Sequence, residues 1–269
     1  MLPNIVIGDR EITPYAICAL IGILLAGGLA FFSVRKKDKS KDADFVIVML
    51  VAILGVGAGG SLLYAITHIP RIPALISEGH DIISIAMAIF GGSVFYGGLF
   101  GGLLAGLIGC KLMKVSPSVY ADIAAFMIPF FHIFGRIGCF LSGCCFGMKS
   151  DIGFVYHYSP ITAANGDTRF PIQLVEAAGN LIIFTVIYLL WRKVVMKTGK
   201  LENRLLGIYF VSYPVMRFIL EFFRGDTYRG VAFGIISTSQ VISIFAFILG
   251  IILLTRKHGG KNIDNKSII

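Results

Sequence analysis

The sequence predicts an all-α fold, that of a polytopic membrane protein with about seven transmembrane helices. Of its 269 residues, 56% are hydrophobic and 14% are charged, and the mean hydropathy is +0.83. Soluble domains average about 25% charged residues, so this composition is typical of membrane proteins. Apolar runs long enough to cross a bilayer recur along the whole chain. We expect the spans at residues 12–34, 44–66, 83–109, 119–135, 171–191, 205–223 and 233–255.

The distribution of basic residues predicts the orientation of these spans. Sixteen of the 24 lysines and arginines fall in the loops after the first, third and fifth spans and in the C-terminal tail. Basic loops stay inside, so we expect the N-terminus outside and the C-terminus inside. The same distribution accounts for the net charge of +9 without a nucleic-acid partner. The first span is too long, and its flank too poor in basic residues, for a cleaved signal peptide.

We expect a single integral membrane domain over residues 1–269, because no internal repeat is apparent. Residues 147–170 form the longest outer connection, which is polar and has little apolar periodicity. This connection is either a lid or a small extramembrane element. Residues 256–269 form a basic inner tail.

Residues 132–147 are the most unusual stretch, because an apolar run leads into an arginine, a histidine, three cysteines and four glycines. An arginine at the rim of a bilayer is unfavourable unless it faces protein, water or an anion. So many glycines predict a break in the helix, and irregular backbone at this depth persists only where it lines a cavity or is buried. The stretch is therefore either a helix end with a snorkelling arginine or a site that holds a negative group.

Polar side chains recur at helical spacing on three expected spans. They are the pairs His132 and Arg136, Gln173 and Glu176, and the trio Arg217, Glu221 and Arg224. Residues three or four apart share one helix face, so the trio should point in one direction. One interpretation is an internal Arg–Glu–Arg triad that links helices. The other is that one arginine points at a ligand, and the two are compatible because a triad can also orient an arginine.

The three arginines Arg136, Arg217 and Arg224 are expected in the outer half of the membrane or at its rim. The planar guanidinium matches phosphate geometry, which favours a receptor for an anionic phospholipid headgroup. The site either only binds the lipid or catalyses displacement of the headgroup, in which negative charge builds on the phosphate. A transporter is disfavoured, because the two halves contain no inverted repeat or paired broken helices.

Three segments together resemble the prolipoprotein diacylglyceryl transferase family: residues 135–138, 171–176 and 213–224. The order and spacing agree from Tyr15 to Gln240. The resemblance implies a multi-pass enzyme of the bacterial plasma (cytoplasmic) membrane, with its active site toward the outer face. Such an enzyme transfers diacylglyceryl from phosphatidylglycerol to the lipobox cysteine in the signal peptide of a prolipoprotein, and releases glycerol phosphate. The resemblance implies no cofactor.

The resemblance also assigns roles to residues. Arg136 would hold the lipid phosphate, and Arg217 with its partner Glu221 would serve a second essential position. The remaining positions are expected to bind substrate, and they are Tyr15, Cys139, Gln173, Glu176 and Arg224.

Several positions depart from the family pattern. Tyr96 stands where the family has a histidine, Cys139 where it has an asparagine, Cys144 where it has an acidic residue, and Ser61 where it has an arginine. A tyrosine with a pKa near 10 is a poor base for a thiol whose pKa is near 8.5. Three alternatives stay open: Tyr96 acts in catalysis, His132 replaces the family histidine as base, or the acceptor arrives already as a thiolate.

The cysteines Cys139, Cys144 and Cys145 are expected at the outer face, where a disulfide is permissible. Their C-x4-C-C spacing is a poor zinc pattern because no second ligand pair lies near it, so we expect no metal. Self-transfer of the lipid to a cysteine and a redox-sensitive clamp are further alternatives. At the level of function, the alternative to the transferase is a non-catalytic or differently specific phospholipid-binding protein that uses the same arginine pocket.

Overall fold

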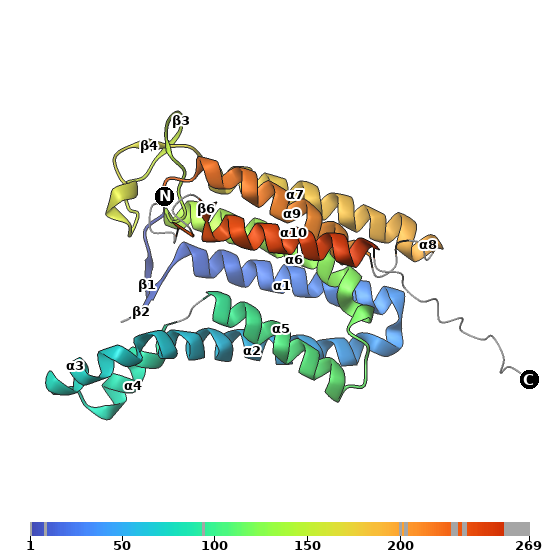
Figure 1. The fold of residues 1–269 in the computed structure, drawn as a ribbon, viewed down its shortest axis with the longest axis horizontal. Helices are drawn as coiled ribbons and strands as arrows, with labels where there is room; N and C mark the ends of the chain where they lie inside the picture. Colours follow the sequence, from blue (N-terminus) through green and yellow to red (C-terminus); the bar gives the residue numbers. More distant parts are fainter. Residues whose placement is uncertain are drawn as a thin grey trace, which may run out of the picture. The chain divides into compact units, whose positions relative to one another are not determined.

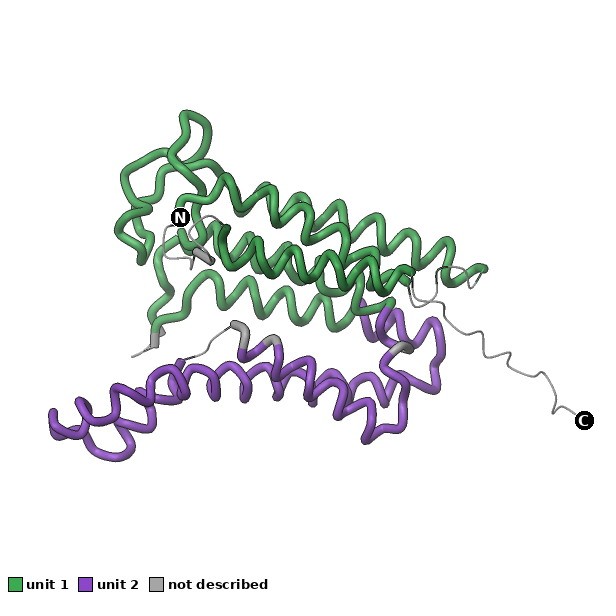
Figure 2. The backbone as a smooth tube through the Cα atoms, in the orientation of Figure 1, with its two compact units in different colours: residues 1–28, 122–269 green, residues 29–121 purple. Residues whose placement is uncertain are grey.

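The computed structural model describes residues 2–7, 10–92, 95–198, 201, 204–226, 231–232 and 236–255. Its chain forms two compact units (Figure 2): residues 1–28 with 122–269, and residues 29–121. Helices dominate both units, and six of them are long and apolar enough to cross a membrane, with a shorter apolar one besides. The predicted all-α, polytopic fold is therefore confirmed. The predicted inner tail lies outside the described residues.

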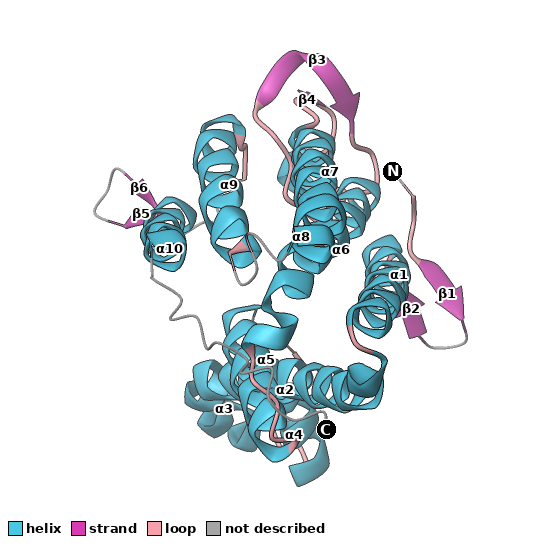
Figure 3. Ribbon diagram, turned by 90° about the vertical axis from the view of Figure 1, so that its right-hand side faces the viewer, coloured by secondary structure: helices cyan, strands magenta, loops and turns pink. Residues whose placement is uncertain are grey.

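The first unit is a bundle of apolar helices that run side by side (Figures 1 and 3). It is built from the first half of α1 (Pro14–Lys37), α6 (Ser118–Ser142), α7 (Ile172–Leu190), α9 (Leu205–Leu220) and α10 (Thr238–Thr255). A π-helical turn, Trp191–Val195, extends α7 into α8 (Met196–Thr198). Glycines allow close approach: a Cβ at Gly22 of α1 would lie 2.8 Å from Phe134 of α6, and one at Gly250 of α10 would lie 2.7 Å from the backbone of Phe210 in α9.

The second unit pairs two helices, α2 (Asp42–His68) and α5 (Phe95–Leu112), through facing glycines. A Cβ at Gly59 would lie 2.3 Å from the carbonyl oxygen of Gly97, and one at Gly55 would lie 2.5 Å from that of Gly101. No side chain fits between the two backbones, so these glycines set the helix separation. Four short helices complete the unit: η1 (Lys39–Lys41), η2 (Ile69–Arg71), α3 (Ile72–Ser77) and α4 (Ile82–Phe90).

Two predicted helix boundaries are wrong. The third span was expected to be continuous over 83–109, but α4 ends at Phe90 and α5 begins at Phe95. Glycine is a poor helix former, and a Cβ at Gly92 would lie 2.3 Å from the ring of Tyr64, so this position requires glycine. Conversely, the glycines near Arg136 do not break α6, which continues to Ser142. The helix ends instead before Gly143, which has a φ of +71°.

The connection over residues 147–170 is a small β-element with its own core. Strand β3 (Lys149–Val155) pairs antiparallel with β4 (Thr168–Arg169), and the turn between them contains η3 (Thr162–Ala164). Phe146, Tyr156 and Ala164 are buried together beneath it. The guanidinium of Arg169 lies 4.8 Å from the centre of the Phe146 ring, which closes the core.

Two further short hairpins occur in the first unit. Strand β1 (Ile5–Ile7) pairs with β2 (Arg10–Ile12), and β5 (Val231–Ala232) pairs with β6 (Ile236–Ser237). The amide of Leu2 donates a hydrogen bond of 3.1 Å to the carbonyl oxygen of Leu141, which ties the N-terminal segment to the end of α6.

Candidate active site

Arg136 of α6 is paired with Glu176 of α7. Its Nη2 lies 3.0 Å from Oε1 of Glu176, and the hydroxyl of Tyr213 in α9 donates to the same oxygen at 3.4 Å. The Glu176 side chain is 1% exposed, whereas that of Arg136 is 21% exposed. The Arg136 guanidinium is therefore paired with a fixed, buried carboxylate, and its side chain as a whole is only partly exposed.

His132 lies one turn before Arg136 and contributes its ring to the same cluster. The centre of the imidazole is 5.2 Å from that of Tyr213, and the ring lies near Glu176 and Asn180. The side-chain amide of Asn180 is held in place because its Nδ2 donates to the backbone oxygen of Glu176 at 2.8 Å. The structure thus joins the predicted pairs on α6 and α7 into one polar cluster.

Arg217 of α9 is the second buried guanidinium. Its Nη2 lies 2.6 Å from Oε2 of Glu221 and donates to Oγ of Ser239 in α10 at 3.1 Å. Its Nη1 is buried and has no hydrogen-bond partner among the described residues. Tyr213 lies one turn earlier and within electrostatic range of both Arg136 and Arg217. The sequence interpretation missed Tyr213, although its four-residue spacing from Arg217 was a usable signal.

The predicted Arg–Glu–Arg triad is wrong at Arg224. Helix α9 ends at Leu220, η5 (Glu221–Phe223) follows, and Arg224 is extended, with φ −86° and ψ 142°. Its Nε and Nη2 donate to the two carboxylate oxygens of Asp226, each at 3.1 Å. The spacing argument failed because it assumed an uninterrupted helix. Burial raises the pKa of Asp226, and the Arg224 guanidinium opposes that rise.

The segments after α6 and α9 are joined at this point. The backbone amide of Met148 donates to the carbonyl oxygen of Phe223 at 2.9 Å, and the backbone amide of Gly225 donates to the carbonyl oxygen of Phe146 at 3.0 Å. A Cβ at Gly225 would lie 2.3 Å from the carbonyl oxygen of Gly147, so the two chains touch through their backbones. Arg224 is therefore held beside the turn that carries the cysteines.

Gln173, at the start of α7, fixes that turn. Its Nε2 donates to the carbonyl oxygen of Cys144 at 2.8 Å and to the hydroxyl of Tyr156 at 2.9 Å. Burial raises the pKa of Tyr156, whose side chain belongs to the core of the β-element. Gln173 thus connects the bundle to the outer connection, and no sequence pattern indicated Tyr156 as its partner.

The three cysteines of this stretch come together in space. Cys139 is in the last turn of α6, and Cys144 and Cys145 are in the turn that follows. Their sulfur atoms all lie within 4.8 Å of one another, and the structure has them as free thiols. Hydrogen bonding with the other two thiols and the charges of Arg224 and Arg136 hold the pKa of Cys145 well below its usual range.

The two predicted tyrosines have different outcomes. Tyr15 is the second residue of α1, its backbone amide donates to Oγ of Ser142 at 2.9 Å, and it lies within electrostatic range of Arg136. It is therefore part of the first unit's polar cluster. Tyr96 is in the first turn of α5, in the second unit, and its side chain lies outside the described residues.

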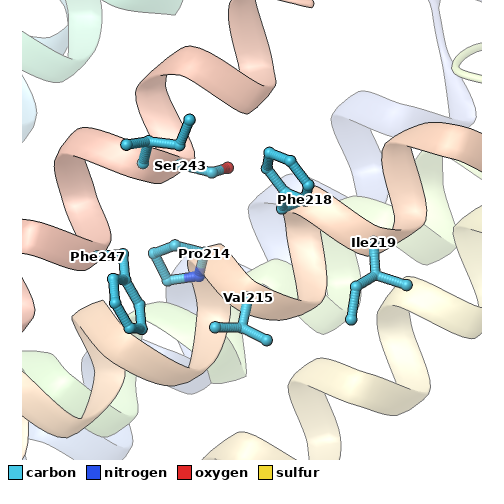
Figure 4. Close-up of a pocket in the computed structure, with 7 residues that line it drawn as sticks. Pro214, Val215, Phe218, Ile219, Ser243 and Phe247 are labelled. Atoms are coloured by element: carbon cyan, nitrogen blue, oxygen red, sulfur yellow. The ribbon is translucent and has the colours of Figure 1, made fainter. Parts of the chain in front are cut away.

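An apolar groove lies between α9 and α10, close to Arg217 (Figure 4). Its cavity of about 240 Å³ is lined by Pro214, Val215, Phe218 and Ile219 from α9 and by Ser243, Ile244 and Phe247 from α10. Ser243 follows by one turn the serine that binds Arg217, and its hydroxyl donates to the Ser239 carbonyl at 2.8 Å. An acyl chain is a chemical match for such a lining.

The fold and this site define the class of protein: a multi-pass membrane protein whose helix bundle holds buried, paired arginines beside an apolar groove. A family model described as prolipoprotein diacylglyceryl transferase matches residues 4–256, so the chain belongs to this transferase family.

Curated relatives agree with this assignment. A phosphatidylglycerol–prolipoprotein diacylglyceryl transferase from Clostridium tetani is 31% identical over 240 residues, which is 88% of this chain and 90% of the relative. The Clostridium perfringens protein named phosphatidylglycerol–prolipoprotein diacylglyceryl transferase 2 is 32% identical over 98% of this chain and 100% of its own length. A relative of the same family from Campylobacter curvus is 32% identical over 88% of this chain and 87% of its own.

Proposed function

We propose that this protein transfers the diacylglyceryl group of phosphatidylglycerol to the lipobox cysteine thiol of a prolipoprotein and releases glycerol phosphate. The names of its relatives supply the two substrates. The observation that carries the assignment of the site is that two paired guanidiniums, those of Arg136 and Arg217, both lie within electrostatic range of Tyr213, whose hydroxyl donates to the carboxylate partner of Arg136.

The two arginines suit a phosphate whose charge increases during the reaction. The bond between the glyceryl carbon and the ester oxygen breaks, and its electron pair leaves on the phosphate. Arg217 has one buried Nη1 donor without a protein partner in the described chain, and the Arg136 side chain is 21% exposed. Their carboxylate partners hold the guanidiniums in place, so no reorganisation is required as the charge develops.

His132 is the candidate for accepting the thiol proton. It is one helical turn from the phosphate-binding Arg136, and its ring packs on Tyr213. Histidine is the side chain suited to proton transfer near neutral pH. Tyr96 remains the alternative, because its position matches that of the family's histidine.

The groove between α9 and α10 suits one acyl chain of the donor lipid. Its wall is apolar, and it begins one helical turn from the Arg217–Ser239 contact. A lipid with its phosphate at Arg217 would then extend its chain along α10. With the predicted orientation, we expect the reaction at the outer face of the bacterial plasma membrane.

The test is the reaction itself. Purified protein is incubated with phosphatidylglycerol and a lipobox peptide, and glycerol phosphate release is followed together with the peptide mass. We expect equal amounts of both products. Release without a mass increase would indicate another acceptor or water, and lipid binding without either product would favour the non-catalytic binding protein.

A further inference from the structure

The cysteine cluster formed by Cys139, Cys144 and Cys145 has the dimensions of a metal site. Zinc–sulfur bonds of about 2.3 Å in a tetrahedral site place the sulfurs roughly 3.8 Å apart. The three sulfurs here already lie within 4.8 Å of one another, so small side-chain rotations bring them to that spacing. A second pair of ligands is not required, because a catalytic zinc site uses three protein ligands.

The backbone that carries the cluster is fixed on several sides. The amide of Cys144 donates to the carbonyl oxygen of Cys139 at 3.1 Å, and Ser159 Oγ donates to that of Gly143 at 2.8 Å. Cys145 has a φ of +56°, which is unfavourable for a residue with a side chain. This strained turn brings the second and third thiols toward the first, which is the arrangement that a shared ligand would require.

Two guanidiniums lie near the negative charge that a metal–thiolate complex would carry. Three thiolates with one Zn²⁺ carry a charge of −1, and a fourth thiolate makes it −2. Cys145 lies within electrostatic range of Arg224 and Arg136. Each of these arginines also pairs with a carboxylate, so their positive charges offset that of the complex only in part. Cys144 and Cys145 are only partly buried, so one side of the cluster is open to a further ligand.

We propose that the three cysteines bind Zn²⁺ and leave its fourth position for the thiol of the acceptor peptide. This inference rests on the proposed transferase function and adds a way to activate its nucleophile. Zinc suits this arrangement because it takes four ligands in a tetrahedron and forms stable bonds to thiolates. The cluster supplies three ligands, and no fourth protein ligand joins it in the described chain.

The proposed step balances without a redox partner. As its sulfur binds the zinc, the acceptor thiol gives its proton to His132, the base of the proposed transfer. A sulfur lone pair then forms the bond to the glyceryl carbon, and the carbon–oxygen bond to phosphate breaks, with its electron pair leaving on glycerol phosphate. The thioether that results is a weak ligand, so the product dissociates and the position reopens.

The experiment uses the full chain in detergent. The protein is depleted of metal with a chelator and titrated with Co²⁺ as a spectroscopic probe. We expect one equivalent to bind with sulfur-to-metal charge-transfer and tetrahedral d–d bands, and Zn²⁺ to displace it. Cys145→Ser should weaken binding at least tenfold, while Cys110→Ser, a buried cysteine of the second unit, should not.

The acceptor's part is tested with two peptides. A lipobox peptide should shift the d–d bands of the Co²⁺-loaded protein, whereas the same peptide with serine in place of its cysteine should not. Transfer activity should fall at least tenfold on chelation and return with Zn²⁺. Binding of Cu⁺ without Co²⁺ or Zn²⁺ would overturn the proposal, because a three-coordinate site offers no open position.

The failures of the two proposals are distinguishable. Full transfer by chelated wild-type protein would overturn the zinc proposal and leave the transferase function in place. Absence of transfer in every metal state, with the lipid still bound, would remove the transferase function and the zinc role that depends on it. The chelation arm needs no variant, so misfolding of Cys145→Ser cannot obscure the result.

Discussion

The two arginines at the centre of the site are each neutralised by a carboxylate. Arg136 pairs with Glu176 on another helix, and Arg217 pairs with Glu221 one turn along its own helix. Ions inside a membrane bundle normally pair in this way, and such positions are commonly functional. A phosphate that enters must therefore share each guanidinium with its carboxylate, which the five donors of an arginine permit.

Arg217→Lys should strongly reduce transfer although it preserves the charge. Lysine is a point charge and cannot reproduce the planar set of donors that reaches Glu221, Ser239 and a phosphate together. We expect a loss of about 10²- to 10³-fold in kcat, as for removal of a preorganised donor to a developing charge. The measurement is glycerol phosphate release. Arg192→Gln is the matched control, because Arg192 is exposed, and activity retained by Arg217→Lys would refute the phosphate role.

Arg136→Gln should reduce both stability and transfer, and a second variant separates the two effects. The single change leaves the carboxylate of Glu176 buried and unpaired, which costs about 3 kcal/mol or more. The double variant with Glu176→Gln removes both charges and should regain much of that stability but no activity. Thermal unfolding in detergent and the transfer assay are measured on the same preparations. Activity in the double variant would show that Arg136 does not bind the phosphate.

At this scale, the sequence predicts which residues carry charge but not their partners. The four-residue spacing of His132 and Arg136 correctly placed both on one side of α6. Nothing local indicated that Glu176, 40 residues later, would receive Arg136, because that contact depends on how α6 packs on α7. Arg224 shows the opposite error: its local spacing was clear, but the helix ended before it.

At the scale of elements, glycines decide how closely α2 and α5 approach. A Cβ at Gly59 would clash with the backbone of Gly97, whereas a Cβ at Gly57 would have no atom within 4 Å. Both residues are in α2, so they form a matched pair in which only the packing differs.

Gly59→Ala should therefore destabilise the second unit, and Gly57→Ala should not. The added methyl at Gly59 has no space beside a carbonyl oxygen 2.3 Å away, so the helices must separate, which costs about 1–3 kcal/mol. At Gly57 the higher helix propensity of alanine is neutral or stabilising by up to about 1 kcal/mol. Thermal unfolding in detergent distinguishes them, and equal midpoints would contradict the close packing of α2 on α5.

Tyr156→Phe should loosen the connection between the β-element and α7. The change removes the acceptor of one Gln173 hydrogen bond and costs about 1 kcal/mol. The effect also depends on pH. Because burial raises the pKa of Tyr156 in the folded protein, its contribution to stability is fully present below pH 10 and is lost as the pH rises through the folded pKa.

The measurement compares unfolding of wild type and Tyr156→Phe between pH 8 and 11. The difference in stability should stay constant up to about pH 10, the ordinary tyrosine pKa, and then shrink. Subtracting the variant removes the contribution of other groups that titrate in this range. A difference that grew with pH would mean that the phenolate is favoured in the folded state.

At the scale of the whole molecule, hydropathy predicted the class of fold and the approximate position of the spans. It did not predict the interruption between α4 and α5, because apolar residues flank the glycines and the close contact of Gly92 with Tyr64 is a tertiary feature. The β-element was not predicted either, since its short strands carry exposed side chains and its core depends on residues at both ends of the connection.

The orientation of the molecule depends on whether α5 crosses the membrane. Its 18 residues span about 27 Å at 1.5 Å per residue, slightly less than a bilayer core of about 30 Å. If it crosses, the loop after it is inside, and the segment after α6 and the cysteine cluster are outside. If it does not, every later element is inverted, and most of the basic residues of the second half lie outside, contrary to the positive-inside rule.

Reporter fusions measure this directly. Alkaline phosphatase, which is active only outside, and a green fluorescent protein, which is fluorescent only inside, are fused after residues 79, 116, 165 and 255. We expect phosphatase activity at 79 and 165 and fluorescence at 116 and 255. The fusions at 79 and 116 bracket α4 and α5, so a shared location for these two would show that α5 does not cross. The donor phosphate and the acceptor peptide would then have to be sought on the inner face, and the outward-facing reaction would be excluded.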